Sequence, residues 1–135
     1  MFSCVRKGLN RRAGGFTLIE MIVVLAILGI LVAMAVPRYL AARKKAYKVE
    51  AQNVLQEMKT LEWAHFQEYG AFDTSPNGTS LGFAPPGGLH WNAPTISGTD
   101  PITITMTGAL PPLTATDTVW ITLASDGSSS GGATF

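Results

Sequence analysis

The stretch that decides the fold is Gly14-Gly15-Phe16-Thr17-Leu18-Ile19-Glu20, together with the uncharged residues from Met21 to Pro37 that follow it. As a helix, the 22 residues from Phe16 to Pro37 measure about 33 Å at about 1.5 Å per residue, enough to cross a hydrocarbon core of about 30 Å. Residues 1–15 carry four basic side chains and no acid. A short basic flank stays in the cytoplasm under the positive-inside bias. We therefore expect one membrane-crossing segment with its N-terminus inside.

Composition excludes several classes of protein. The chain has 135 residues, the size of one domain, and only 14% of them are charged, against about 25% in typical soluble domains. Disordered polyelectrolytes and generally basic nucleic-acid binders are therefore excluded. The single cysteine, Cys4, permits no internal disulfide and no Cys-rich zinc site. No Ser-His-Asp set or glycine-rich nucleotide fingerprint occurs, and His65 and His90 are expected to be packing or surface residues, so we expect no enzyme and no cofactor.

A second helical pattern continues the first. Val54, Leu55, Met58, Leu61 and then His65 or Phe66 recur at steps of three and four, which predicts a one-sided apolar stripe. Gly70 is a typical helix stop. The sequence thus predicts one helix over residues 16–69, about 80 Å long if continuous. We also expect Lys59 and Glu62 to pair on its polar side.

The composition changes after Gly70 to Ser, Thr, Gly and Pro. Residues 70–88 are expected to form a long loop with turns near 76–78 and 85–88. Alternating apolar residues then predict strands around 89–93, 102–107 and 118–123, with a turn at Asp126-Gly127 and a short last strand at 133–135. We expect an α+β fold in which an antiparallel sheet packs on the helical stripe. The aromatic residues at the helix end are predicted to form the core under the sheet: Trp63, Phe66, Tyr69 and Phe72.

The heptapeptide before the apolar segment resembles the class III signal of type IV pilins and of the pseudopilins of type II secretion. The resemblance implies that residues 1–15 are a leader, that a membrane aspartyl peptidase cuts between Gly15 and Phe16, and that the new amine of Phe16 is methylated. Glu20 matches the glutamate of that family, and Gly29 and Pro37 match its helix-softening glycine and proline. A carboxylate near a helix start also simply suits the helix dipole, but within lipid it costs about 2.5–3.5 kcal/mol and indicates a function.

The resemblance implies a filament subunit with three parts: leader 1–15, helix 16–69 (residues 16–37 for membrane and assembly) and exported head 70–135. Its implied partners are copies of itself, other pilins, the prepilin peptidase, an assembly ATPase and a platform protein. The precursor would be stored in the inner membrane and the filament displayed at the cell surface. From Gly70 onward there is no Lys or Arg, so the head is not expected to bind DNA.

Several alternatives stay open at this point. The chain could be a type II secretion pseudopilin, a minor pilin or a bitopic membrane-anchored binding protein. An ordinary signal peptide cut after Ala33-Met34-Ala35 would release a soluble protein beginning at Val36. Asp73 begins a series of oxygen-bearing residues like half of a calcium loop, but Ala84 stands where the closing glutamate is needed, so we expect a plain turn and no metal site. Asn77-Gly78-Thr79 fits a glycosylation acceptor.

Overall fold

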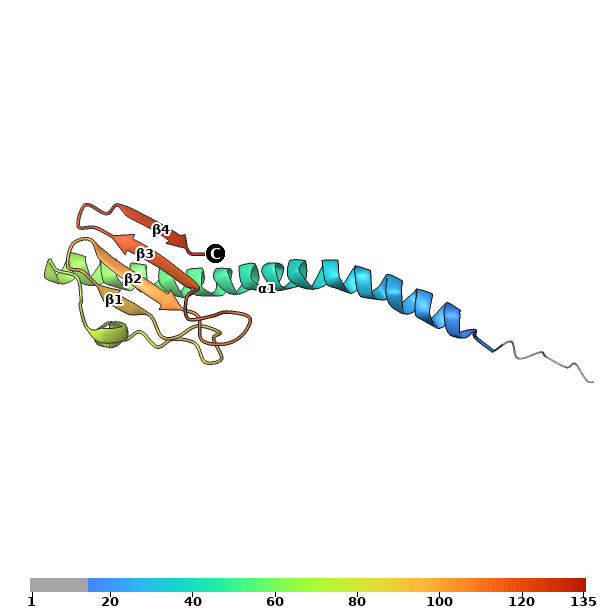
Figure 1. Cartoon of the computed structure of the whole chain (residues 1–135). Helices are drawn as coiled ribbons and strands as arrows, with labels where there is room; N and C mark the ends of the chain where they lie inside the picture. Colours follow the sequence, from blue (N-terminus) through green and yellow to red (C-terminus); the bar gives the residue numbers. More distant parts are fainter. Residues whose placement is uncertain (1–14) are drawn as a thin grey trace, which may run out of the picture. The chain divides into compact units, whose positions relative to one another are not determined.

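The computed structural model describes residues 15–135. The basic leader residues, Cys4 and Gly14 lie outside the described residues. The chain divides into two compact units, the first ending at Pro37 and the second extending from Arg38 to Phe135. The helix α1 (Leu18–Tyr69, 52 residues) contributes to both units (Figure 1). It begins two residues later than the sequence predicts and ends where predicted, because Gly70 adopts a left-handed φ of 74° and donates its N–H to the carbonyl of Phe66 at 2.8 Å.

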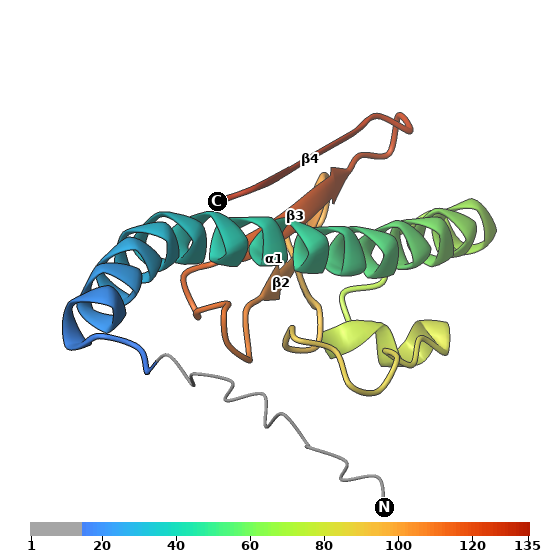
Figure 2. The ribbon, with the colours of Figure 1, turned by 90° about the vertical axis from the view of Figure 1, so that its right-hand side faces the viewer.

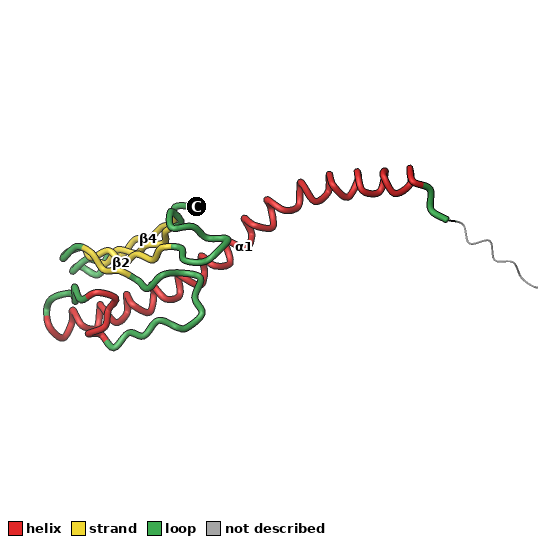
Figure 3. Tube along the Cα trace, turned by 60° about the horizontal axis from the view of Figure 1, so that its bottom comes forward, coloured by secondary structure: helices red, strands yellow, loops and turns green. Residues whose placement is uncertain are grey.

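The second unit is a four-stranded antiparallel sheet packed on one side by α1, which confirms the α+β prediction. The strands are β1 (Thr95–Ser97), β2 (Ile102–Thr107), β3 (Thr118–Leu123) and β4 (Ser129–Ala133), and they lie in the order β1-β2-β3-β4. Figures 2 and 3 show the strands on one side of the helix. Every connection is a hairpin, so the sheet follows the order of the sequence.

The core lies between the sheet and the stripe on α1. The alternation in β2 and β3 places every second side chain inside; these six are Ile102, Ile104, Met106, Val119, Ile121 and Leu123. They meet four buried residues of α1: Ala51, Val54, Leu55 and Met58. The predicted stripe is therefore confirmed, and the 3.6-residue and 2-residue periods that produce it are local properties of the chain.

The first predicted strand is misplaced. Trp91 forms only an isolated bridge with Gly108, whereas regular pairing begins at Thr95 opposite Thr105. Three residues lie between Trp91 and Thr95 but only two lie between Thr105 and Gly108, so one extra residue interrupts the ladder. Pro94, which is fully buried, lies in this interruption and has no N–H to donate to a ladder.

The last strand also differs from the prediction. It begins at Ser129 and ends at Ala133, immediately after a tight turn in which Ala124 donates to the carbonyl of Ser128 at 3.0 Å. Serine and glycine have low strand propensity, so the sequence pattern missed it. Pairing with β3 requires the glycines, because a Cβ on Gly131 would lie 2.9 Å from the carbonyl oxygen of Trp120.

The predicted loop after Gly70 contains a short 3₁₀ helix, η1 (Pro76–Leu81), interrupted by left-handed Asn77 and Gly78. Gly78 is buried against Met58, whose methyl group would lie 2.7 Å from a Cβ at that position. Packing of Gly78 against Met58 therefore orders part of this loop. A local sequence pattern does not reveal that contact. The turn at Gly87-Gly88 is present as predicted.

Two predictions about the helix end are wrong. Glu62 is fully buried; its Oε2 accepts the N–H of Asp73 at 3.1 Å, while Lys59 donates to Ser129 Oγ at 3.2 Å. Glu62 follows Met58 by four residues and therefore shares the buried face. Tyr69 is 66% exposed, so it is not part of the core. Among the other aromatic residues, Phe72 is buried in the core. Trp63 and Phe66 are partly buried and pack against the core.

Candidate assembly segment

The start of α1 is set by a threonine cap. Thr17 Oγ1 accepts the backbone N–H of Glu20 at 3.3 Å, and the carbonyl of Thr17 accepts the N–H of Met21 at 3.3 Å. Thr17 is thus the N-cap and Glu20 the third helical residue, the spacing of a capping box. The sequence pattern suggested a helix-dipole role and an assembly role for Glu20 but not this cap, although Thr-x-x-Glu is visible in the sequence.

Glu20 therefore has a local role beside any role in a filament. Its negative charge lies in the first turn of α1, where the unpaired N–H groups of a helix favour an anion by about 0.3–1 kcal/mol. Replacing Glu20 by a large apolar residue would change both the cap and the charge. Glutamine keeps the capping-box hydrogen-bonding groups and removes only the charge.

The Gly15–Phe16 bond lies just outside the helix. Both residues precede Leu18, have no regular secondary structure and are exposed, and the Phe16 side chain is 74% exposed. Exposed backbone outside regular secondary structure is where proteolytic cleavage concentrates. The geometry is therefore compatible with cleavage at this bond.

The first unit presents apolar side chains all round. Leu18 and Ile19 are 78% and 70% exposed, and the same holds along the helix for residues such as Leu25, Ile30 and Leu31. The most apolar 18-residue window of α1 has no residue buried. By length and composition this helix could cross a membrane, and a signal sequence near an N-terminus would pass the same test. So much exposed apolar surface indicates burial in lipid or against other helices.

Gly29 and Pro37 both lie within α1. A Cβ added to Gly29 would meet no atom within 4 Å, so nothing within the described residues requires glycine at that position. Pro37 cannot donate a helical hydrogen bond. Their predicted role as softening points remains a prediction, and Gly29→Ala offers a test of it because the substitution causes no clash in the subunit.

The other candidate residues of the sequence analysis have packing roles. His90 stacks on Tyr47 with 3.9 Å between ring centres, and His65 Nδ1 lies 3.0 Å from the carbonyl oxygen of Ala71. The carboxylate of Asp73 accepts hydrogen bonds from the hydroxyl groups of Ser75 and Ser80, which is a turn of the kind expected. No group of three or more metal-ligating side chains occurs within residues 15–135.

Comparison with known families identifies the first unit. Residues 10–36 match the family described as "Prokaryotic N-terminal methylation motif". The match covers the Gly15–Phe16 bond, the Thr17 cap, Glu20 and Gly29. The N-terminal segment of this chain therefore carries a prokaryotic N-terminal methylation motif.

Several relatives of the chain are named as pilus components. The chain is 37% identical over 82 residues to the type IV major pilin protein PilA of Myxococcus xanthus, across 61% of this chain and 36% of that protein. It is 58% identical over 36 residues to the type IV wide pilus major component PilA4 of Thermus thermophilus, across 27% of this chain and 28% of the other. It is 36% identical over 78 residues to the type IV major pilin protein PilE1 of Neisseria gonorrhoeae, across 58% and 46%.

These matches have a limited extent. The chain spans less than half the length of each of these pilins, and no solved structure matches it. The relatives are structural pilins, not enzymes.

Proposed function

We propose that the chain is a structural subunit of a type IV pilus-like filament. In this proposal residues 1–15 are a leader, residues 16–69 form the helix, of which 16–37 serve membrane storage and assembly, and residues 70–135 form the exported head. The observation that carries the proposal is the match of residues 10–36 to the methylation motif, on a helix whose apolar side chains are exposed all round.

The exposed apolar helix supports polymerisation. In the cytoplasmic membrane, with its N-terminus inside, the segment up to Pro37 is solvated by lipid. In a filament, neighbouring copies of the same segment replace that lipid. Little apolar surface therefore meets water at any stage, so extraction from the membrane need not overcome the full hydrophobic cost of exposing it.

Glu20 is proposed to select the register of each added subunit. Cleavage before Phe16 creates an amine four residues from Glu20. If the helix extended over Phe16 after cleavage, the two would lie about 6 Å apart along its axis. The carboxylate can receive that amine or the amine of the next subunit. In the apolar centre of a filament an unpaired carboxylate is costly and a paired one much less so. A subunit added in register neutralises a buried charge, and one added out of register does not.

The proposal includes the machinery that such a subunit needs. We propose that a prepilin peptidase cuts after Gly15 and methylates Phe16, that an assembly ATPase with a platform protein drives polymerisation, and that other pilins join the filament. Gly29 and Pro37 are proposed to soften the helix during extraction. The relatives named as major pilins favour a pilus subunit over a secretion pseudopilin.

Mass spectrometry of the mature N-terminus tests the proposal. A methylated Phe16 is expected, together with surface filaments in electron micrographs. A protein beginning at Val36 would make the chain an exported soluble protein, and an intact Met1 would make it a bitopic anchor. Filaments that appear only with an intact type II secretion system would indicate a pseudopilin.

A matched pair of variants sharpens this test. Gly15→Leu should retain the leader and abolish filaments, because the peptidase must accommodate the glycine beside the membrane. Gly29→Ala is the control for cleavage, since it adds a methyl group in the same segment without a clash and should be processed normally. Mature protein of normal length from Gly15→Leu would refute the cleavage assignment.

A further inference from the structure

The outer face of the sheet is almost entirely hydroxyl-bearing. While the apolar residues of β2 and β3 point inward, their alternate residues point away from α1. Register places these residues side by side with those of β1 and β4. Nine positions make up this surface, which we call the hydroxyl face: Thr95, Ser97, Thr103, Thr105, Thr107, Thr118, Trp120, Thr122 and Ser130.

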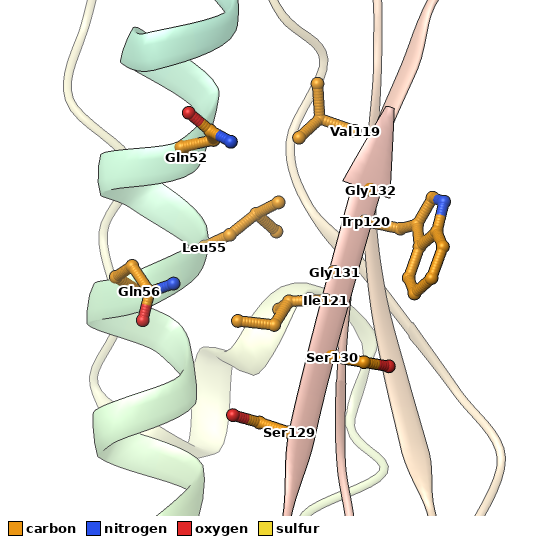
Figure 4. Close-up of a pocket in the computed structure, with 10 residues that line it drawn as sticks. All are labelled: Gln52, Leu55, Gln56, Val119, Trp120, Ile121, Ser129, Ser130, Gly131 and Gly132. Carbon is orange, nitrogen blue, oxygen red and sulfur yellow. The ribbon is translucent and has the colours of Figure 1, made fainter. Parts of the chain in front are cut away.

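Trp120 is the one aromatic residue of the hydroxyl face. Figure 4 shows its ring on the opposite side of β3 from Val119 and Ile121, which point toward Leu55 on α1. Trp120 pairs with Thr105 on one side and with Gly132 on the other. A Cβ on Gly132 would lie 2.9 Å from ring atom Cζ2 and 3.1 Å from Cε2 of Trp120. The ring thus lies over Gly132 of β4, a position that has no side chain.

The polar groups on this face retain hydrogen-bonding capacity. Thr95 and Ser97 donate their hydroxyl protons to the backbone carbonyls of Thr105 and Thr103, at 3.3 and 3.4 Å. Within residues 15–135, the Trp120 indole N–H and the hydroxyl groups of Thr103 and Thr105 make no hydrogen bond. The hydroxyl groups of Thr122 and Ser130 lie 2.7 Å apart. Thr122 also contacts the backbone of Ser130, whereas the Ser130 hydroxyl keeps a free lone pair. The groups that remain open take no part in the packing of the buried core, so a ligand can bind to them.

The geometry of the face suits an extended ligand without charge. Neighbouring strands lie about 4.8 Å apart, and alternate residues along a strand about 6.7 Å apart, so the hydroxyl groups form a regular array around the ring. None of the nine positions is charged. An anionic or cationic ligand would therefore lose hydration without gaining a counter-charge. An apolar peptide segment would find one ring and no apolar groove.

A sugar ring matches these features. It has C–H groups on its faces, which pack on the face of an aromatic ring, and hydroxyl groups around its rim, which can donate to and accept from Thr and Ser. We propose that the hydroxyl face binds a neutral, β-linked polysaccharide, with one sugar stacked on Trp120 and its neighbours hydrogen-bonded to the threonines of β2 and β3. This binding activity is additional to filament formation and does not depend on it.

Binding of the intact chain to microcrystalline cellulose tests the proposal. The full chain is purified in a polyoxyethylene detergent, because a detergent with a sugar headgroup would compete. Depletion from solution is measured over a range of cellulose concentrations, with cross-linked dextran as an α-linked control matrix. We expect binding to cellulose, competition by soluble cellohexaose and no binding to dextran.

Three variants identify the surface. Trp120→Ala should weaken binding about tenfold, as loss of a central aromatic contact usually does. Thr105→Val, which keeps the shape and removes one hydroxyl, should weaken it about threefold. Tyr69→Ala removes another exposed aromatic ring, at the end of α1 and away from the sheet, and should bind like the wild type.

Several results would overturn the proposal. The wild type could fail to bind cellulose more than dextran, or Trp120→Ala could bind as the wild type does. If circular dichroism finds Trp120→Ala unfolded, Trp120→Phe and Thr105→Val decide the question, and wild-type binding by both would overturn it. A shift of Trp120→Ala to a smaller assembly, without any effect of cellohexaose on the wild type, would assign the face to a second copy of the chain. Filaments are scored separately, so failure here leaves the proposed function intact.

Discussion

Lys44 on α1 donates from Nζ to both carboxylate oxygens of Asp117, at 3.1 and 2.9 Å, across 73 positions of the sequence. Asp117 is buried, and its Oδ2 also accepts the N–H of Thr114 at 2.7 Å. The pair ties the helix to the turn that leads into β3. The Lys44 side chain is 30% exposed, so water screens the interaction in part.

Replacing Lys44 tests this tie. Lys44→Met keeps the aliphatic stem and leaves Asp117 with only its Thr114 contacts, so we expect a loss of about 1 kcal/mol in the free energy of unfolding. Lys45→Met is the matched control, because Lys45 is exposed. Denaturant unfolding followed by tryptophan fluorescence provides the measurement. Equal stability of the two variants would mean that the pair contributes nothing.

The same pair predicts an acid-sensitive step. The hydrogen bond from Lys44 is the main cause that lowers the pKa of Asp117 below its usual value. A lowered pKa in the folded state stabilises the fold above the unfolded pKa of about 3.9 and loses that contribution as pH falls through the folded value. Stability should therefore fall below about pH 4. The loss of stability at low pH should be smaller in Lys44→Met than in the wild type. An identical loss in both proteins would mean that the Lys44–Asp117 pair does not cause it.

Glu62 predicts a pH dependence of opposite sign. Burial raises the pKa of this carboxyl, and the hydrogen bond from the Asp73 N–H offsets the rise only in part. Its Oε1 is buried without a partner among the described residues. Because the pKa of Glu62 is raised in the folded state, its contribution to stability is fully present below the pKa of the unfolded chain, about 4.3. That contribution is lost as the pH rises through the pKa of the folded state.

Glu62→Gln isolates this effect. Glutamine keeps an oxygen for the Asp73 N–H and carries no charge, so the decline in stability above about pH 4.3 should disappear. Glu57→Gln is the control, because Glu57 is exposed on the same helix. Unfolding free energies at several pH values between 4 and 8 provide the comparison. A decline that persists unchanged in Glu62→Gln would show that another group causes it.

Glu20 can be separated from its capping role by two substitutions. Glu20→Gln should be cleaved and inserted normally but form few or no filaments, because it lacks the charge that we propose pairs with a neighbouring amine. Thr17→Ala removes the cap, at a cost of about 1 kcal/mol to the helix, and should still assemble. Electron microscopy and the cleavage state are read together. Abundant normal filaments from processed Glu20→Gln would reduce Glu20 to a residue that stabilises the helix start.

DNA binding should be confined to the helix. The chain from Gly70 onward has four aspartates and no Lys or Arg, so it cannot displace counterions from phosphates. Any salt-sensitive shift of duplex DNA by the chain without residues 1–15 should vanish when the basic residues of the helix other than Lys44 are changed to Gln: Arg38, Arg43, Lys45, Lys48 and Lys59. Lys44 is kept because it is paired with Asp117. Retained binding in that variant would point to the head and contradict the prediction.

Local patterns were sufficient for much of this protein. The apolar helix, its stop at Gly70, and strands β2 and β3 follow from periods of 3.6 and 2 residues, which depend only on backbone geometry. The motif around Glu20 is equally local, because the cap, the carboxylate and the proposed cleavage site all lie within residues 15–20. For the same reason the similarity to pilins could be stated before any tertiary structure was considered.

Tertiary packing decided the rest. Glu62 is buried because the loop after Gly70 folds over the end of α1 and brings the Asp73 N–H to it. β4 forms from serine and glycine because β3 offers an open edge and Trp120 leaves no room for larger side chains. The Lys44–Asp117 pair and the hydroxyl face likewise join residues that are distant in sequence. Periodicity assigns a side chain to a face, but only the pairing of strands and the packing of the helix determine which residues become neighbours.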